Sequence, residues 1–224
     1  MTNASRHARE LIFRAPWFQD EVAGRLELEE PLISRAIEAI LAAGILPSSF
    51  HANSKALAVD AATMLLAIGT RQTRPESTCR VAKRLEAMRQ QCEIGSQPEL
   101  DEKADIFPQT DSTSFGSDLF VLFQNLWRAA RGTTTKGFKG VSVSMLWNDD
   151  GSILFGLIEQ NQRKRIYSSE ALQIPAGGWD YIRLPAAGGT IFSPLIILRF
   201  GALLDAVVSD TAATLDGLEI PHAK

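Results

Sequence analysis

The chain is poor in the residues that build metal centres and disulfide frameworks. Its 224 residues include two cysteines, Cys79 and Cys92, and three histidines, His7, His51 and His222. Neither the cysteine nor the histidine spacing fits a zinc site, and two cysteines thirteen positions apart make no disulfide scaffold. We therefore expect reduced thiols and predict no metal and no cofactor.

Long apolar runs are also missing. The longest candidate, "TIFSPLIILRFGALLDAVV", is interrupted by Pro194, Arg199 and Asp205, whereas a membrane span needs about 18 uninterrupted apolar residues. The start, "MTNASRHAREL", lacks a basic segment followed by an apolar one, so we expect no secretory signal. With 45% hydrophobic and 22% charged residues, the sequence predicts a globular cytoplasmic protein with no membrane partner.

Signatures of catalysis are lacking too. The glycines do not have the spacing of a phosphate-binding loop, and no glycine-framed serine accompanies the scattered histidines. The carboxylate pair Asp149–Asp150 lies in "NDDG", a sequence typical of a hairpin turn. The sequence therefore predicts a protein that is not an enzyme.

Charge is unevenly distributed, although the formal net charge is only −3. Residues 71–91 include six basic and two acidic residues. Residues 92–120 include one basic and seven acidic residues, and residues 121–140 include four basic and no acidic residues. Such blocks are usually solvated faces and linkers, but a basic block is also where a polyanion would bind.

The apolar spacing divides the chain into two parts of different character. Apolar residues recur every three or four positions through the first ninety residues, and this predicts five helices. The first helix ends near Phe13. The next three run from Trp17 to Leu26, from Pro31 to Gly44 and from Lys55 to Ile68. The fifth is a basic helix from Pro75 to about Cys92.

From Val141 the period changes to two, which predicts a hairpin around "NDDG", a third strand at "RIYSS" and a candidate fourth at "WDYIRL". Ser117 and Asp118 are expected to cap a helix ending at Gly132, and another helix follows residue 193. The basic run "RKR" at 163–165 falls in a predicted turn, where it would be solvated or would reach a phosphate backbone.

The fold class is therefore α+β: a helical domain (1–92), an acidic linker (93–118), and a domain for dimerisation or partner binding that contains a small antiparallel sheet with packed helices (119–224).

The stretch "VAGRLELEEPLISRAIEAILAAGIL" carries the pattern of a helix-turn-helix. Val22 and Ala23 supply the apolar and small pair that the first helix needs, Leu26 and Leu28 flank the turn, and Ile33 takes the inward position of the second helix. Ser34 and Arg35 then project outward.

This stretch resembles helix-turn-helix transcription regulators. Its ending "ILAAGIL" resembles that of winged-helix regulators, and "ALAVDAATMLLAIGT" resembles regulators encoded by prophages. The resemblance implies that Ser34 contacts a phosphate or a base edge and Arg35 a guanine or a phosphate.

The sequence departs from the helix-turn-helix pattern at the turn. Glu27 stands where glycine is common, and Glu29 and Glu30 open the second helix where small polar or basic residues are usual. These two glutamates are expected to cap the helix and interact with its dipole, which leaves the DNA contacts to Ser34, Arg35 and the basic helix. The basic helix carries Arg80, Lys83, Arg84 and Arg89.

The sequence thus predicts a sequence-specific DNA-binding transcription regulator of phage or prophage type. Because one helix-turn-helix neutralises few phosphates, we expect a homodimer or higher oligomer bound to double-stranded DNA. The alternative is an oligomeric assembly protein, such as a phage DNA-packaging subunit, that binds DNA irrespective of sequence. In a third interpretation the N-terminal part is only a helical module, and Arg35 is a solvated surface residue.

Overall fold

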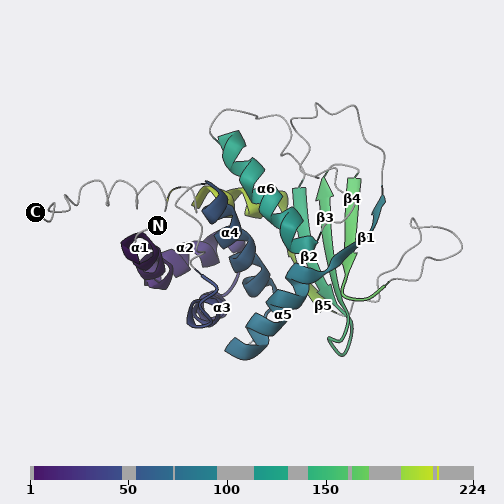
Figure 1. Ribbon diagram of the computed structural model, residues 1–224, viewed down its shortest axis with the longest axis horizontal. Coiled ribbons are helices and arrows are strands. Elements are labelled where there is room, and N and C mark those ends of the chain that lie inside the picture. Colours follow the sequence, from purple (N-terminus) through teal and green to yellow (C-terminus); the bar gives the residue numbers. More distant parts are fainter. Residues whose placement is uncertain are drawn as a thin grey trace, which may run out of the picture.

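A layer of helices covers one face of a five-stranded antiparallel sheet, so the predicted α+β class is confirmed (Figure 1). The computed structural model describes residues 3–46, 54–72, 74–94, 114–130, 141–160, 163–171, 188–203 and 206.

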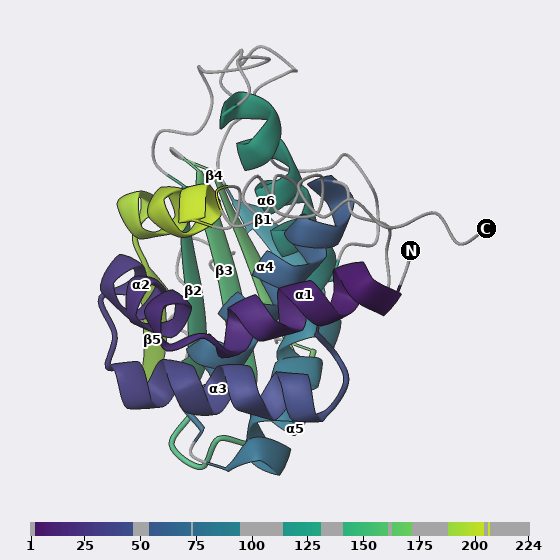
Figure 2. The ribbon, with the colours of Figure 1, turned by 90° about the vertical axis from the view of Figure 1, so that its left-hand side faces the viewer.

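Five helices precede the first strand. They are α1 (Asn3–Arg14), α2 (Pro16–Leu26), α3 (Glu30–Ala42), α4 (Ser54–Gly69) and α5 (Pro75–Ala87). Prolines occupy the first turns of α2, α3 and α5, where the fixed φ angle suits a helix start and the missing N–H has no intrahelical partner to lose. Figure 2 shows α1, α2 and α3 as the outermost helices, with the sheet behind them.

The strands form one sheet in the order β1-β4-β3-β2-β5. Their bounds are β1 (Arg89–Ile94), β2 (Val141–Trp147), β3 (Leu154–Gln160), β4 (Arg163–Ser168) and β5 (Gly188–Phe192). The predicted hairpin and third strand are confirmed, because β2 pairs with β3 and β3 with β4, both antiparallel. The candidate strand "WDYIRL" lies outside the described residues, and β5 was not predicted.

The prediction of one long basic helix up to Cys92 is wrong. Helix α5 ends at Ala87, and Met88 leaves the helical region with ψ at 134°. Residues from Arg89 onward pair with β4, with Cys92 opposite Ile166. Arginine, glutamine and glutamate are good helix formers, but strand pairing and burial outweigh that local preference here.

Helix α6 (Phe115–Ala130) begins earlier than expected. Ser117 and Asp118 lie inside its first turn, and Asp118 is 1% exposed, so neither residue stands before the helix as predicted. The expected stop at Gly132 lies outside the described residues. The predicted helix after residue 193 is confirmed over 194–203.

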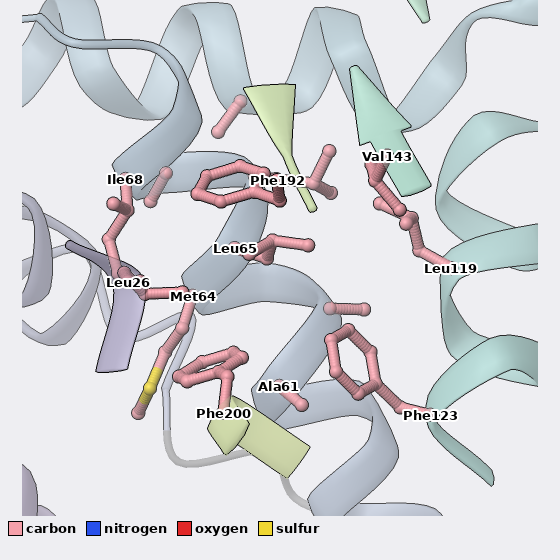
Figure 3. Close-up of a cluster of buried hydrophobic side chains, with 14 of the residues drawn as sticks. Leu26, Ala61, Met64, Leu65, Ile68, Leu119, Phe123, Val143, Phe192 and Phe200 are labelled. Atoms are coloured by element: carbon pink, nitrogen blue, oxygen red, sulfur yellow. The ribbon is translucent and has the colours of Figure 1, made fainter. Parts of the chain in front are cut away.

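One hydrophobic cluster joins the helices to the sheet (Figure 3). It contains Leu26 from α2, Leu65 from α4, Phe123 from α6 and Phe192 from β5, and fully burying each such side chain stabilises the fold by about 1.5 to 3 kcal/mol. The predicted domain boundary at residue 92 lies inside β1, and the cluster includes side chains from both sides of it.

The end of α4 lies directly against the sheet at Gly69. A Cβ atom at this position would lie 2.2 Å from the Met145 sulfur, so any larger residue here would displace the Met145 side chain. The Thr190 hydroxyl of β5 also donates a 3.1 Å hydrogen bond to the Gly69 carbonyl. These contacts fix the helical layer on β2 and β5 and thereby set the position of the N-terminal helices.

Candidate nucleic-acid interface

Helices α2 and α3 are joined by the three residues 27–29, as a helix-turn-helix requires. Glu27 has φ at 55°, in the left-handed region, and its N–H donates to the Ala23 carbonyl. Glycine is common at this position because it enters the left-handed region without a steric clash. A glutamate in the same region has a less favourable backbone conformation because of its Cβ atom. Val22, Leu26 and Ile33 are all buried, as the pattern predicts.

Helix α3 is buried around most of its circumference. It contacts α1, α2, α4 and α5, and six of its thirteen residues are buried. Of the two predicted contact residues, Arg35 is exposed and Ser34 is half-buried. Arg35 therefore presents its side chain to a partner more freely than Ser34 does.

The N-terminal end of α3 carries exposed negative charge at Glu29 and Glu30, whereas Glu27 in the preceding turn pairs with Arg199. Glu29 stands at the N-cap position as expected, but its side chain makes no capping hydrogen bond within the described chain. Glu30 lies in the first turn, where a carboxylate interacts favourably with the helix dipole. The same carboxylates repel phosphates, so this end of α3 does not suit close approach to a duplex.

The predicted basic residues Arg80, Lys83 and Arg84 lie on α5, and all three are exposed. Neither Arg80 nor Lys83 forms an ion pair with any residue in the described ranges, and the same holds for Arg35. Arg84 is engaged differently, because its guanidinium donates a hydrogen bond to the Ser152 carbonyl in the turn between β2 and β3.

Helices α3 and α5 pack together along a seam that borders these cations. The Cys79 thiol of α5 donates to the Ala39 carbonyl of α3 at 3.4 Å, and burial raises the pKa of this thiol. Arg35 precedes Ala39 by one helical turn, and Lys83 follows Cys79 by one turn. Residues four apart lie on the same side of a helix, so Arg35 and Lys83 each lie on the side of their own helix that makes this contact. We call the three exposed cations Arg35, Arg80 and Lys83, on these two packed helices, the seam face.

A second group of charged residues lies between the sheet and α6, where its arginines and Asp118 are buried and the Glu93 side chain is 26% exposed. Arg165 on β4 is 3% exposed and donates to both Glu93 on β1 (2.6 Å) and Asp118 on α6 (3.0 Å). Arg163 also pairs with Glu93, and the Tyr167 hydroxyl donates to Asp118. The prediction of a solvated turn at 163–165 is therefore wrong for both arginines, because they belong to β4 and are buried.

The protonation of this network follows from its contacts. Burial alone would raise the pKa of Glu93, but hydrogen bonds from Arg163 and Arg165 outweigh it and hold that pKa below its ordinary value. Burial and the neighbouring Asp118 carboxylate raise the pKa of Tyr167, so the phenol stays protonated. The network is thus a set of matched charges that attaches α6 and β1 to β4. Nothing in the residue pattern around 118 or 165 reveals it, since its members are up to 72 positions apart.

The residues that the structure describes include no group of three or more histidine, cysteine or acidic side chains placed to hold a metal ion. Among these residues no helix combines the length and the apolar character of a membrane span. Comparison with family models, with curated proteins and with solved structures yields no match for this chain.

Proposed function

We propose that this protein binds double-stranded DNA through the seam face and acts as a transcription regulator. The observation that carries the proposal is the set of exposed cations, without ion pairs in the described chain, on two helices that pack against each other. One of these helices, α3, follows α2 with the spacing and burial of a helix-turn-helix. An arginine on such a helix can read guanine bidentately, while cations of a neighbouring helix neutralise phosphates.

The acidic end of α3 is the part of this surface that suits contact with a duplex least. Glu29 and Glu30 repel phosphates, whereas Arg35 lies one turn and a half further along the same helix. The duplex is therefore expected to contact the middle of α3 and the exposed side of α5.

Arg35 provides the first test. If it reads a base, Arg35→Ala should weaken binding to a specific site by about 1 to 3 kcal/mol. The matched control is Lys164→Ala, which also removes one positive charge but lies on the face of the sheet opposite the helices, paired with Glu159. Gel shifts of both variants on genomic fragments, at two salt concentrations, separate specific binding from electrostatic binding. If Arg35→Ala binds as tightly as the unaltered protein, Arg35 is not part of the interface.

Self-association belongs to the proposal, because one helix-turn-helix offers few phosphate contacts and operators are commonly bound by dimers. Sedimentation at micromolar concentration should show a homodimer or a larger oligomer. A strictly monomeric species, with or without DNA, would contradict this part.

A second candidate is an oligomeric assembly protein that binds DNA irrespective of sequence. The carboxylates at the start of α3 favour it, because they oppose deep insertion of that helix into a groove. Retention that is uniform across DNA sequences, together with a ring-sized mass, would support this candidate over a regulator.

A further inference from the structure

The turn between β2 and β3 is a rigid element with an acidic tip. The Gly151 N–H donates to the Asn148 carbonyl (3.0 Å), and the Ile153 N–H donates to the Asn148 side-chain oxygen (2.9 Å). The Asp150 carboxylate accepts a 2.8 Å hydrogen bond from the Ser152 N–H, and Gly151 has φ at 69°. Asp149 and Asp150 are both exposed.

This turn is attached to the helix that carries the seam face. The Arg84 guanidinium of α5 donates to the Ser152 carbonyl, across 68 positions of sequence. Figures 1 and 2 both place the turn at the end of the molecule where α5 lies. Arg84 follows Arg80 by one helical turn and is adjacent to Lys83. One contact therefore occupies a cation of α5 and also attaches the turn that carries two carboxylates to that helix.

The electrostatic consequence is a weaker attraction for phosphates. Hydrogen bonds from Ser152 lower the pKa of Asp150, so its carboxylate is ionised at neutral pH. Two negative charges on a turn attached to α5 offset part of the attraction of the α5 cations for a polyanion and also repel phosphates directly. The rigid turn keeps these charges in place, whereas a flexible acidic loop could move away when DNA approaches.

We propose that the acidic turn, held on α5 by Arg84, is a built-in brake that keeps the affinity of the seam face for DNA below what its cations alone would give. This inference rests on the proposed function, because it concerns the same surface. It assigns Asp149 and Asp150 the role of limiting how tightly a phosphate backbone binds beside α5.

Removal of the two charges tests the brake. Asp149→Asn leaves the turn intact, and Asp150→Asn retains the side-chain oxygen that accepts the Ser152 N–H. Because attraction grows as the negative charge is removed, affinity for a duplex at low salt should rise about twofold for Asp149→Asn and about fourfold for the double variant. The control is Glu159→Gln, which removes one negative charge on the sheet face opposite the helices. Its affinity should stay within error of the unaltered protein.

Fluorescence anisotropy with a labelled 30-base-pair duplex gives three distinguishable outcomes. If the turn variants bind more tightly than both the unaltered protein and Glu159→Gln, the brake is supported. If the unaltered protein binds and the turn variants do not differ from it, or Glu159→Gln gains as much as Asp149→Asn, the brake is overturned while the proposed function stands. If neither the unaltered protein nor the double variant binds, the proposed function and the brake both fail.

Discussion

The charged residues of this protein occupy two regions with opposite physical roles. Between the sheet and α6, Arg165 is 3% exposed and its charge is matched by Asp118 and Glu93. At the seam face, Arg80 and Lys83 are exposed and have no ionic partner in the described chain. Burying a charge costs several kcal/mol unless it is paired, whereas a solvated cation costs nothing and remains available. Pairing together with burial therefore marks the charges that hold the fold together, whereas exposed charges without a partner remain available to bind a ligand.

The largest effect is expected at Asp118. Asp118→Ala would leave the Arg165 guanidinium without one of its two carboxylates and the buried Tyr167 hydroxyl without its acceptor. We expect the free energy of unfolding to fall by about 3 to 5 kcal/mol, as for other buried ion pairs that lose one partner. Urea denaturation followed by circular dichroism measures this change.

Two further variants sharpen the result at Asp118. Asp118→Asn keeps an acceptor for Tyr167 but removes the charge, so its loss should be smaller. Asp20→Ala removes an exposed carboxylate of α2 and should change the free energy of unfolding by no more than about 0.5 kcal/mol. A loss below about 1 kcal/mol for Asp118→Ala would mean that the network contributes little to stability.

A pH-dependent effect of intermediate size is expected at Glu93. Its carboxylate accepts hydrogen bonds from Arg163 and Arg165, and these hold its pKa in the folded state below the ordinary value of 4.5. A depressed pKa means that the stabilisation is complete above the pKa of the unfolded chain and is lost as the pH falls through the folded-state pKa. At pH 7, Glu93→Gln should lower the free energy of unfolding by about 1 to 2 kcal/mol, as expected for charged hydrogen bonds.

Unfolding curves of the two proteins between pH 7 and pH 3 would check this. The difference between the unaltered protein and Glu93→Gln should shrink as the pH falls below 4.5, because the protonated glutamate then resembles glutamine. A difference that stays constant over this range would show that the effect of the substitution is steric.

The local pattern was enough to predict the elements whose structure depends on near neighbours. Helices α1 to α4 and the β2–β3 hairpin follow from periodicity and from turn or helix-start residues such as Pro31 and Gly151. Strand β1 could not be predicted, because "RQQCEI" has good helix formers and becomes a strand only when Cys92 meets Ile166 and Glu93 meets Arg165. Strand β5, "GGTIF", begins with two glycines, which disfavour strands, and it forms by pairing with β2.

The sequence likewise predicted those features of the candidate site that depend on residues close together in the chain. The helix-turn-helix spacing and the exposure of Arg35 follow from sequence pattern, because both depend on a single pair of consecutive helices. The engagement of Arg84 by Ser152 and the burial of Arg163 and Arg165 were not predictable, since their partners are 47 to 72 positions away. A basic residue in a sequence carries no sign of whether the fold will bring an acceptor to it.

The smallest effect on stability is expected at Arg80 and Lys83, because their charges are proposed to serve binding and not folding. Arg80→Ala with Lys83→Ala should change the free energy of unfolding by no more than about 0.5 kcal/mol, because both side chains are solvated and alanine is the better helix former. The same double variant should lose about tenfold in affinity for any duplex, and its salt dependence should be shallower by about two ion equivalents. Urea denaturation and anisotropy titrations at several salt concentrations measure both quantities on one preparation. A variant that binds normally would remove α5 from the interface, and a clearly destabilised variant would show that these two cations, like Arg165, serve the fold.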